Sequence, residues 1–241
     1  MLSKLIKKND FNPGVLGIFF NPFYFARRGL YLNIKSLSHH ISGKILDVGC
    51  GKKPYQNLFQ YSQYVGLEYD TPQNRASKKA DFFYDGKTFP FVNAEFDNII
   101  CNEVLEHVFN PKDFLSEIIR ILKPGGLMLM TVPFVWDEHE QPYDYARYSS
   151  FGLKHLLQEN GFQIIEQRKS VDDVGVIFQL INAYIYKKII GKSIRPNRIK
   201  RIVIRTFCSV FNLAGCLLRL VLPKNQDLYL DNIILAKKPN A

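Results

Sequence analysis

Residues 44–55, KILDVGCGKKPY, are the part of the sequence best suited to bind a ligand. An apolar run ends there in Asp47, and Gly49 and Gly51 follow it. Glycines at this spacing let the backbone turn tightly and approach a ligand closely at the carboxyl end of a strand. An ordinary glycine turn has the same pattern, and a dinucleotide fingerprint needs a third glycine where Pro54 stands. Since Asp47 would repel a pyrophosphate, we expect a ligand that carries an ammonium group and no phosphate.

Two more acids follow the next two predicted strands. Glu68 lies nineteen residues after Gly49, a spacing at which a carboxylate can accept hydrogen bonds from both hydroxyls of a ribose. Asp85, followed by Gly86, can accept from an adenine amino group, although an aspartate before a glycine is also typical of a plain turn. Three acids at three consecutive strand ends favour a nucleoside ligand.

A loop rich in acids, bases and aromatic rings occupies residues 132–148, VPFVWDEHEQPYDYARY. His139 is our candidate for a general base, because an imidazole with a pKa of about 6.5 can take a hydroxyl proton at neutral pH. An alternative of equal weight is that His139 is a structural residue, hydrogen-bonded between Glu138 and Glu140. The candidates for contact with an acceptor are Trp136, Tyr143, Asp144, Arg147 and Tyr148. Alternatively, Asp144 and Arg147 pair and hold the loop, and Trp136 is a lid or a core anchor.

The pattern around these residues predicts an α/β fold with a parallel sheet and helices on both faces. Predicted strands cover residues 44–48, 64–68, 81–84, 96–101, 127–132, 162–167 and 228–236. One helix is predicted from Pro111 to Leu122, with residues 123–126 as its stop. A second helix begins at the cap Ser149 and ends at Gly161.

Length and composition set the broad class of the protein. The chain has 241 residues, of which 46% are hydrophobic, enough for one large domain or two small ones with a buried core. The first ten residues do not resemble a secretory signal, and the four cysteines form no CxxC pair, so we expect a reduced, cytoplasmic protein. His39 and His40 have no acid or cysteine at metal-ligand spacing, and no metal site is expected.

The net charge of +10 comes from one segment, residues 174–226, which holds ten lysines and arginines and no acid. Two uncharged stretches of thirteen residues, 174–186 and 206–218, flank eight of these basic residues. A membrane-spanning helix needs about 20 such residues, so neither stretch is expected to span. We expect helices that lie on an anionic membrane surface, or a helix pair that caps the sheet or forms a dimer interface.

Several motifs together resemble class I S-adenosylmethionine-dependent methyltransferases. They are DVGCG at 47–51, Glu68, Asp85, NEVLEHV at 102–108 and LKPGG at 122–126. The resemblance implies S-adenosyl-L-methionine as the cofactor and a Rossmann-like seven-stranded sheet whose last strand is antiparallel. The expected organisation is N-terminal cap helices at 1–40, a methyltransferase domain at 41–173 and 227–241, and a basic amphipathic helical insertion at 174–226.

The resemblance also implies a cofactor site at the ends of the first four strands. Its residues, in chain order, are Asp47, Gly49, Gly51, Glu68, Tyr69, Asp85, Gly86, Asn102 and Glu103. The first three would hold the methionine part, Glu68 the ribose hydroxyls, and Asp85 with Gly86 the adenine, while Asn102 and Glu103 would pass beside the sulfonium. Glu106 and His107 open the next loop, and His107 and Glu140 are the alternatives to His139 as catalytic residues.

The loop at 132–148 and the stretch NPFYFARRG at 21–29 resemble methyltransferases of bacterial surface polysaccharide and glycolipid biosynthesis. This implies O-methylation of a sugar, glycolipid or other small acceptor at the cytoplasmic face of the membrane. An RNA methyltransferase and a non-catalytic scaffold that keeps the fold are the alternatives. Stacking aromatics are sparse in the basic segment, and the Asn/Asp-Pro-Pro-aromatic tetrad of base-amine methyltransferases is missing after the fourth predicted strand, so nucleic acid is not the favoured partner.

Overall fold

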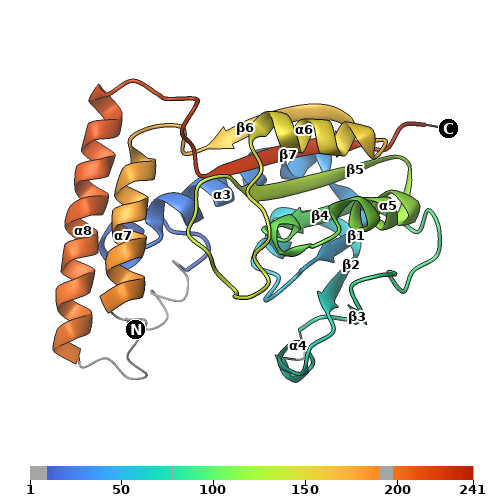
Figure 1. The fold of residues 1–241 in the computed structure, drawn as a ribbon, viewed down its shortest axis with the longest axis horizontal. Coiled ribbons are helices and arrows are strands. Elements are labelled where there is room, and N and C mark those ends of the chain that lie inside the picture. The colour runs from blue at the N-terminus through green and yellow to red at the C-terminus, as the bar shows by residue number, and fades with distance from the viewer. Residues whose placement is uncertain (1–9, 78, 190–197, 241) are drawn as a thin grey trace. The chain divides into compact units, whose positions relative to one another are not determined.

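The computed structural model describes residues 10–77, 79–189 and 198–240 (Figure 1). The chain divides into two compact units. The sheet unit comprises residues 33–168 and 232–241, and the helical unit comprises residues 1–32 and 169–231. Of the predicted basic cluster, Lys192 and Arg195 lie outside the described residues, as do the side chains of Arg198, Lys200 and Arg201. Residues 1–9, on which the absence of a secretory signal was argued, also lie outside them.

A seven-stranded sheet has the strand order β3-β2-β1-β4-β5-β7-β6. The strands are β1 (Ser42–Val48), β2 (Gln60–Tyr69), β3 (Phe82–Tyr84), β4 (Phe96–Asn102), β5 (Leu122–Pro133), β6 (Gln163–Ser170) and β7 (Asp231–Lys237). Neighbours from β3 to β5 are parallel, and the last strand is antiparallel. The central strands β4 and β5 are buried along most of their length, which explains their continuous apolar sequences. The predicted fold is confirmed.

The carboxyl ends of four parallel strands meet at one edge of the sheet. Val48 at the end of β1 is paired with Cys101 of β4 and with Leu67 of β2. Tyr69 at the end of β2 is paired with Tyr84 of β3. Because β1 has β2 on one side and β4 on the other, the strand order reverses at this point. Open α/β sheets bind their ligands at such a reversal, outside the carboxyl ends of the strands.

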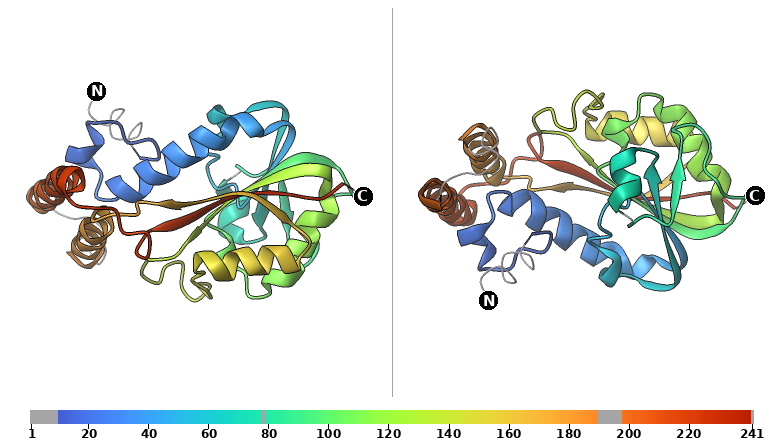
Figure 2. Two further views of the ribbon diagram at one scale, coloured as in Figure 1. Left: turned by 90° about the horizontal axis from the view of Figure 1, so that it is seen from above. Right: turned by 90° about the horizontal axis from the view of Figure 1, so that it is seen from below.

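Helices α5 (Pro111–Ile121) and α6 (Ser150–Glu159) cover one face of the sheet (Figure 2). Pro111 begins α5, whose buried side includes Phe114 and Ile118. The Ser149 hydroxyl caps α6, as predicted, and accepts a 3.2 Å hydrogen bond from the amide of Gly152. The sheet unit also contains α4 (Pro72–Ser77) and the 3-10 turns η1 (Ser38–His40), η2 (Gln56–Leu58) and η3 (Leu105–His107).

The KPGG motif at 123–126 lies inside a strand rather than between a helix and a strand. Helix α5 ends at Ile121 and β5 begins directly afterwards, because Leu122 pairs with Phe96 of β4. The register then shifts before Asn98, where Gly125 has a positive φ of 76° and takes up the extra residues. The prediction was wrong at this boundary, since a side-chain pattern does not report which backbone groups pair across strands.

The helical unit contains α2 (Gly17–Phe20), α7 (Gly175–Ile189), α8 (Arg198–Val221) and the first part of α3 (Tyr24–Leu37). One face of α8 is buried at a four-residue spacing, through Ile204, Cys208 and Asn212. The side-chain amide of Asn182 in α7 donates a 2.8 Å hydrogen bond to Asn212 Oδ1. Since buried amides must be hydrogen-bonded, this pair fixes how α7 and α8 pack.

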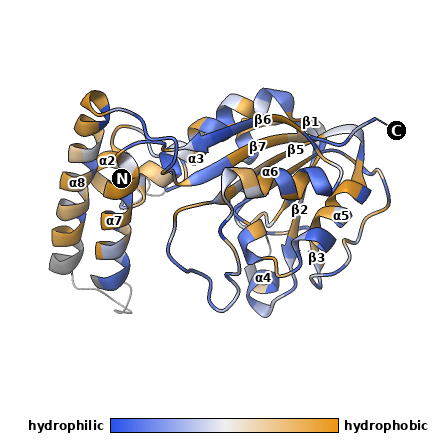
Figure 3. Cartoon of the chain, turned by 45° about the horizontal axis from the view of Figure 1, so that its top comes forward, coloured by the Kyte–Doolittle hydropathy of each residue, from blue (hydrophilic) through white to orange (hydrophobic). Residues whose placement is uncertain are grey.

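Helix α8 is longer than the predicted apolar stretch at 206–218 and is largely apolar (Figure 3). Its residues 202–221 form a 20-residue segment of mean hydropathy 1.5, long and apolar enough to cross a membrane by length and composition, of which 22% is buried. The prediction that neither stretch reaches spanning length is wrong for this helix, because it continues through Arg205 and Arg219. Arg219 Nε pairs with Asp173 Oδ2 at 2.7 Å, which compensates its charge.

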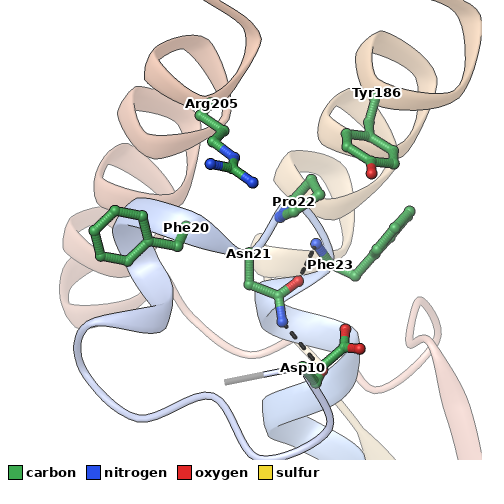
Figure 4. A pocket seen from close by; sticks show the side chains of 7 residues that line it. All are labelled: Asp10, Phe20, Asn21, Pro22, Phe23, Tyr186 and Arg205. Carbon is green, nitrogen blue, oxygen red and sulfur yellow. Dashed lines mark hydrogen bonds between the residues drawn. The ribbon is translucent and has the colours of Figure 1, made fainter. Parts of the chain in front are cut away.

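The NPF stretch at 21–23 has a structural role in the helical unit. The Asn21 side chain accepts a 2.8 Å hydrogen bond from the amide of Phe23 and donates to the carbonyl of Asp10 at 3.2 Å (Figure 4). The pocket in Figure 4, of about 140 Å³, is lined by Asp10, Phe20, Asn21, Pro22, Phe23, Tyr186 and Arg205. The stretch therefore fixes the start of α3 and is explained without an acceptor.

Candidate active site

Asp47 is a buried carboxylate at the end of β1. Its Oδ2 accepts a 2.7 Å hydrogen bond from the hydroxyl of Tyr64, and 5% of the residue is exposed. Burial raises the pKa of Asp47 to about 7, because the carboxylate has lost most of its hydration. A ligand that places an ammonium group against Asp47 would supply the positive charge that favours its ionised form.

The loop after Asp47 allows a ligand to approach its backbone. Gly49 and Gly51 have φ angles of 68° and 48°, in the left-handed region that glycine adopts most readily. A Cβ atom on Gly51 would meet no atom within 4 Å, so this side of the loop is open. Lys53 Nζ donates to Asp81 Oδ2 at 2.6 Å and ties the end of the loop to the chain before β3.

Glu68 lies near the end of β2, and its carboxylate is held in place. Its Oε1 accepts a 2.6 Å hydrogen bond from the amide of Gly51, and its Oε2 accepts a 3.1 Å bond from the side chain of Asn74. Burial raises the pKa of Glu68, and the nearby charge of Glu140 adds to this effect. Each carboxylate oxygen keeps a lone pair for another donor, as the binding of two ribose hydroxyls requires.

Asp85 has the turn role that was its alternative. Its Oδ1 accepts hydrogen bonds from the amides of Lys87 and Thr88, at 3.0 and 3.4 Å, and these bonds use one of its two oxygens. A Cβ on Gly86 would lie 2.9 Å from the ring of Tyr69, so this ring packs against the turn. The structure brings the predicted ribose and adenine residues together, with Asp85 committed in part to its own turn.

The end of β4 carries an unsatisfied acceptor and a strained backbone. Asn102 Oδ1 is buried and has no hydrogen-bond partner among the described residues. Glu103 follows with a φ of 54°, and its Oε1 accepts a 2.8 Å hydrogen bond from the Thr131 hydroxyl. A left-handed conformation costs a residue with a side chain about 1–2 kcal/mol. Strain of this kind concentrates at functional sites, which agrees with the predicted place of this segment beside a sulfonium.

These groups fit S-adenosylmethionine. Asp47 and Asn102, at the ends of the neighbouring strands β1 and β4, offer acceptors of the kind that the ammonium group of the methionine part would need. Glu68 offers two fixed carboxylate oxygens, as two ribose hydroxyls would need. The glycine loop, the reversal of strand order and the acids therefore all fit the predicted donor site.

A cluster of Glu106, His107 and His139 lies next along the chain. Glu106 and His107 belong to η3, and His139 comes from the loop that follows β5. The Nε2 atoms of His107 and His139 lie 3.7 and 3.9 Å from Glu106 Oε1. Glu140 Oε2 lies 3.9 Å from His107 Nε2. The structure thus brings together His139 and both of its predicted alternatives.

Glu106 is the most unusual group of this cluster. Its exposed fraction is 0%, and both of its carboxylate oxygens lack a hydrogen-bond partner among the described residues. Burial raises the pKa of Glu106 well above its usual range, and the charge of Glu103 adds to this. Burial also lowers the pKa of His139, and the neighbouring His107 lowers it further. Glu106 therefore lacks polar partners among the described residues, and the imidazole of His139 is neutral at neutral pH.

Asp144 and Arg147 form the brace of the loop, as the structural alternative predicted. The two guanidinium nitrogens of Arg147 donate to the two carboxylate oxygens of Asp144, both at 2.6 Å. These bonds lower the pKa of Asp144 to about 2. Asp144 Oδ2 also accepts a 2.8 Å hydrogen bond from the amide of His139, so the ion pair positions the histidine.

The loop is fastened to η3 through its backbone. His107 Nδ1 lies 2.6 Å from the carbonyl oxygen of Tyr143, and the amide of Tyr145 donates to the carbonyl of Glu106 at 2.8 Å. The Tyr145 ring packs edge to face with Phe109 at 5.3 Å, and both rings are exposed. Exposed rings therefore border the cluster, and Phe109 is a candidate acceptor contact that sequence reasoning missed.

The two other predicted acceptor contacts are half-buried in this region. Burial raises the pKa of Tyr148, and the charge of Glu106 adds to it, so Tyr148 lies within electrostatic reach of the cluster. The carbonyl of Trp136 lies 3.5 Å from Arg147 Nε. Sequence reasoning also missed Tyr64 and Asn74, which position Asp47 and Glu68; neither has a sequence signal beyond its place near a strand end.

The fold and the donor site together define a class I S-adenosylmethionine-dependent methyltransferase. A family model described as a methyltransferase domain matches residues 24–167, which is more than half of the chain. The chain belongs to this family, and its cofactor is S-adenosylmethionine.

Two curated relatives are similar over part of their length. A probable S-adenosylmethionine-dependent methyltransferase of Mycolicibacterium smegmatis is 27% identical over 142 residues, which are 53% of this chain and 55% of that protein. The O-methyltransferase rstn1 of Aspergillus nomiae is 28% identical over 147 residues, which are 51% of this chain and 65% of that protein. The match thus spans between half and two thirds of each relative.

Two solved structures share the fold. The [4+2]-cyclase SpnF matches with a TM-score of 0.59 and 19% identity, covering 90% of this chain and 83% of that one. Phosphoethanolamine N-methyltransferase 2 of Haemonchus contortus, in complex with S-adenosyl-L-methionine, matches with a TM-score of 0.57 and 17% identity, covering 93% of this chain and 56% of that one. At these identities the likeness shows the fold alone.

Proposed function

We propose that the protein transfers the methyl group of S-adenosylmethionine to a hydroxyl of a polyhydroxylated acceptor, such as a sugar or a glycolipid. The main support is the cluster of Glu106, His107 and His139, which follows directly on the strand that ends the donor site. Imidazole and carboxylate groups at that position can remove the proton of a hydroxyl. An amine acceptor that has lost its proton to solvent already has a free lone pair. It would therefore depend less than a hydroxyl on these imidazole and carboxylate groups.

When bound, S-adenosylmethionine supplies a methyl group on a positively charged sulfur. The acceptor oxygen forms a bond to this methyl carbon while the carbon–sulfur bond breaks, and the hydroxyl proton leaves. Products are a methyl ether and S-adenosylhomocysteine. The chain must align the two partners and receive one proton, and a neutral His139 can accept it.

The exposed rings beside the cluster favour a sugar. Phe109, Tyr143 and Tyr145 present apolar surface next to acid and amide groups, and both kinds of contact suit a ring with hydroxyls and C–H faces. An O-methyltransferase among the relatives agrees with oxygen as the acceptor atom.

Transfer of a labelled methyl group tests this proposal. The protein is incubated with methyl-labelled S-adenosylmethionine and, separately, with glycolipid extract, soluble oligosaccharide and RNA, and the products are identified by mass spectrometry. We expect label in an O-methyl group of the glycolipid or oligosaccharide, and none with Asp47→Ala. Label in RNA, or on nitrogen, would overturn the proposal, and donor binding without transfer to any class would favour the scaffold.

We further propose that the helical unit lies on an anionic membrane surface, where a lipid-linked acceptor resides. Opposite its buried face, α8 exposes a continuous apolar stripe, made of Val203, Phe207, Val210, Leu213, Leu217 and Leu220. Phe19 of the N-terminal segment extends the stripe, since its carbonyl accepts a hydrogen bond from Ser209 of α8 and its ring is exposed. An exposed apolar patch of this extent is typical of an interaction surface.

The positive charge of the same segment favours an anionic membrane surface as the partner. Basic residues gather at the start of α8 and at the end of α7, while the acids Asp172 and Asp173 pair with Lys224 and Arg219 at the other end of α8. An apolar stripe with basic residues beside it suits an anionic headgroup layer. If the helical unit lies on the membrane surface, the hydrogen bond between Asn182 and Asn212 stays buried between α7 and α8 and does not face lipid.

A further inference from the structure

We propose that Glu106, His107 and His139 bind a divalent transition-metal ion. The three residues offer one carboxylate oxygen and two imidazole nitrogens, and these atoms lie within 4.8 Å of one another. The inference rests on the proposed function for the role of the ion, and not for its binding. It replaces the expectation that the protein has no metal site.

The orphaned carboxylate is the first reason. Glu106 is fully buried and neither of its oxygens has a hydrogen-bond partner among the described residues. A buried carboxylate without partners has lost its hydration and gains no hydrogen bond or charge in return, which destabilises its ionised form. A cation between Glu106 and the two imidazoles would compensate this cost.

The second reason is how the two imidazoles are held. His107 Nδ1 lies 2.6 Å from the carbonyl oxygen of Tyr143, so this nitrogen carries the proton and donates. His139 Nδ1 lies 3.3 Å from the carbonyl oxygen of Asp137 and 3.2 Å from Asp144 Oδ2, two acceptors that favour a proton on the same nitrogen. A guanidinium nitrogen of Arg147 also lies 3.4 Å from His139 Nδ1, but it donates to Asp144 Oδ2 at the shorter distance of 2.6 Å. Both Nε2 atoms then have free lone pairs, and both face Glu106 Oε1. Metal-binding histidines are oriented by such a hydrogen bond from the other ring nitrogen.

The distances fit an ion after a small adjustment. Ligands at about 2.0–2.1 Å from a tetrahedral ion lie about 3.4 Å apart. The separations from Glu106 Oε1 to the two Nε2 atoms are 3.7 and 3.9 Å. They are too long for a hydrogen bond, and side-chain rotations that shorten them by a few tenths of an ångström would suit an ion. All three ligand atoms lie within 4.8 Å of one another, so the two imidazoles would also have to move towards each other.

The ligand types decide which ion is suitable. Two imidazoles and a carboxylate are typical of zinc, cobalt, manganese or iron, whereas magnesium and calcium prefer oxygen ligands alone. Glu140 Oε2, 3.9 Å from His107 Nε2, can supply a fourth ligand or receive a proton. The remaining positions would be open to water or to an acceptor oxygen, as in catalytic zinc sites.

This arrangement would change the role of His139 in the proposed reaction. With the ion in place, His139 would act as a ligand, and the ion would orient the acceptor hydroxyl and ease the loss of its proton. Methyl transfer itself would be unchanged: the oxygen–carbon bond forms as the carbon–sulfur bond breaks, and the proton leaves to Glu140 or to water.

Binding of Co²⁺ tests the site without any turnover. The full-length protein is freed of metal with a chelator, and Co²⁺ is titrated while its visible absorption is recorded. We expect one equivalent to bind, with absorption bands of a nitrogen- and oxygen-ligated site, and Zn²⁺ to displace it. Binding should also raise the Tm, because the ion binds the folded state alone.

Variants locate the site. Glu106→Gln and His139→Ala should each weaken Co²⁺ binding by at least about tenfold, as loss of one of three ligands implies. His155→Ala is the matched control, since His155 lies on α6 with a side chain 75% exposed, beside Glu159, and should bind as the unchanged protein does. If Glu106→Gln does not fold, the Co²⁺ affinity of His139→Ala still tests the site. His139 is half-buried on a loop, so we expect this variant to fold.

Two results would overturn the inference: no Co²⁺ absorption at one equivalent, or equal binding by His139→Ala and the unchanged protein. Full methyl transfer by the chelated protein would contradict the role of the ion in the reaction and leave the proposed function intact, with Glu106 as a neutral acid and His139 as a direct base. Co²⁺ binding without methyl transfer to any acceptor would instead support the site and contradict the proposed function.

Discussion

The backbone of Gly49 lies directly against the side chain of Val104. A Cβ atom on Gly49 would come within 2.3 Å of Val104 Cγ2, closer than real Cβ contacts allow. Gly49 belongs to the donor loop, and Val104 stands two residues before Glu106. The contact therefore joins the loop that holds the methyl donor to the segment that carries the acid and base groups.

Gly49→Ala should weaken binding of S-adenosylhomocysteine by roughly tenfold. The new Cβ meets Val104, and the φ of 68° adds strain of about 1–2 kcal/mol, so the loop should leave its binding conformation. Calorimetric titration measures the affinity. Gly49→Ala/Val104→Ala should recover part of it, and Gly152→Ala is the control, because its Cβ lies 3.4 Å from Ser149 Oγ. Unchanged affinity in Gly49→Ala would contradict the assigned contact.

Donor affinity should rise with pH through about 7. Burial raises the pKa of Asp47 to about 7, so its carboxyl group is neutral below that pH and charged above it. The ammonium group of the donor favours the charged form. Titration of S-adenosylhomocysteine between about pH 5.5 and 7.5, where this ammonium stays mainly protonated, should show the rise, and Asp47→Asn should bind more weakly with a flatter profile.

The same shift predicts an effect on stability of opposite sign. Because the folded-state pKa of Asp47 is raised, its contribution to stability falls as pH rises from the unfolded value of about 4 to about 7. Asp47→Asn should therefore unfold at a higher temperature than the unchanged protein above pH 7, with the difference lost in acid. A lower Tm for Asp47→Asn at high pH would show that Asp47 is stabilised by partners instead.

His139→Ala should lower turnover by about a hundredfold or more with donor affinity nearly unchanged. The residue belongs to the loop after β5, whereas the predicted donor contacts lie at the ends of β1, β2 and β4. Steady-state kinetics and titration of S-adenosylhomocysteine separate the two effects. His155→Ala should be fully active; a fully active His139→Ala would pass the role to His107, Glu140 or solvent.

Asp144 and Arg147 should show a large coupling energy. The Asp144 side chain is 3% exposed and both of its oxygens bind Arg147 at 2.6 Å, so Arg147→Ala leaves a buried charge without its partner. A double-mutant cycle in urea should give a coupling of about 1–3 kcal/mol. The exposed pair Lys112 and Glu159, 3.5 Å apart, is the control and should give less than about 1 kcal/mol. Equal coupling energies in both pairs would contradict the role of Asp144 and Arg147 as the brace of the loop.

The helical unit should bind anionic vesicles better than neutral ones in a flotation experiment. Each basic residue near an anionic surface contributes about 1 kcal/mol, and the apolar stripe adds burial, so attachment should be weakened but not abolished by salt. Neutralising Lys187, Lys188, Arg198, Lys200, Arg201 and Arg205 should reduce recovery.

Phe207→Ser should reduce recovery as well, whereas Phe151→Ser, on the exposed side of α6, should not. Equal recovery with both vesicle types would contradict the membrane proposal and favour a helix-pair interface. Protein that stays with the membrane after alkaline carbonate extraction would show α8 to be a span.

The donor side was predictable from the sequence because its residues follow strand ends. Asp47, Glu68 and Asn102 each lie where an apolar run stops, and parallel strands bring their carboxyl ends to one edge whatever the connections between them. A periodic pattern with a known topology was enough to gather them.

The boundary at Leu122 and the length of α8 were not predictable in this way. Leu122 is placed by backbone pairing with Phe96, and α8 continues past Arg205 and Arg219 because tertiary partners such as Asp173 compensate a charge that breaks the apolar run. Side-chain periodicity contains neither kind of information.

By itself the sequence determined the class of fold and the cofactor, and it predicted the strand ends expected to hold it. The cluster of Glu106, His107 and His139 was decided by the tertiary structure. Two of its members are adjacent in sequence, but the third is brought to them by a loop that backbone bonds fasten to η3 and that Asp144 and Arg147 brace. Burial then leaves the Glu106 carboxylate without a partner, and burial is a property of the packed chain that no local pattern of residues records.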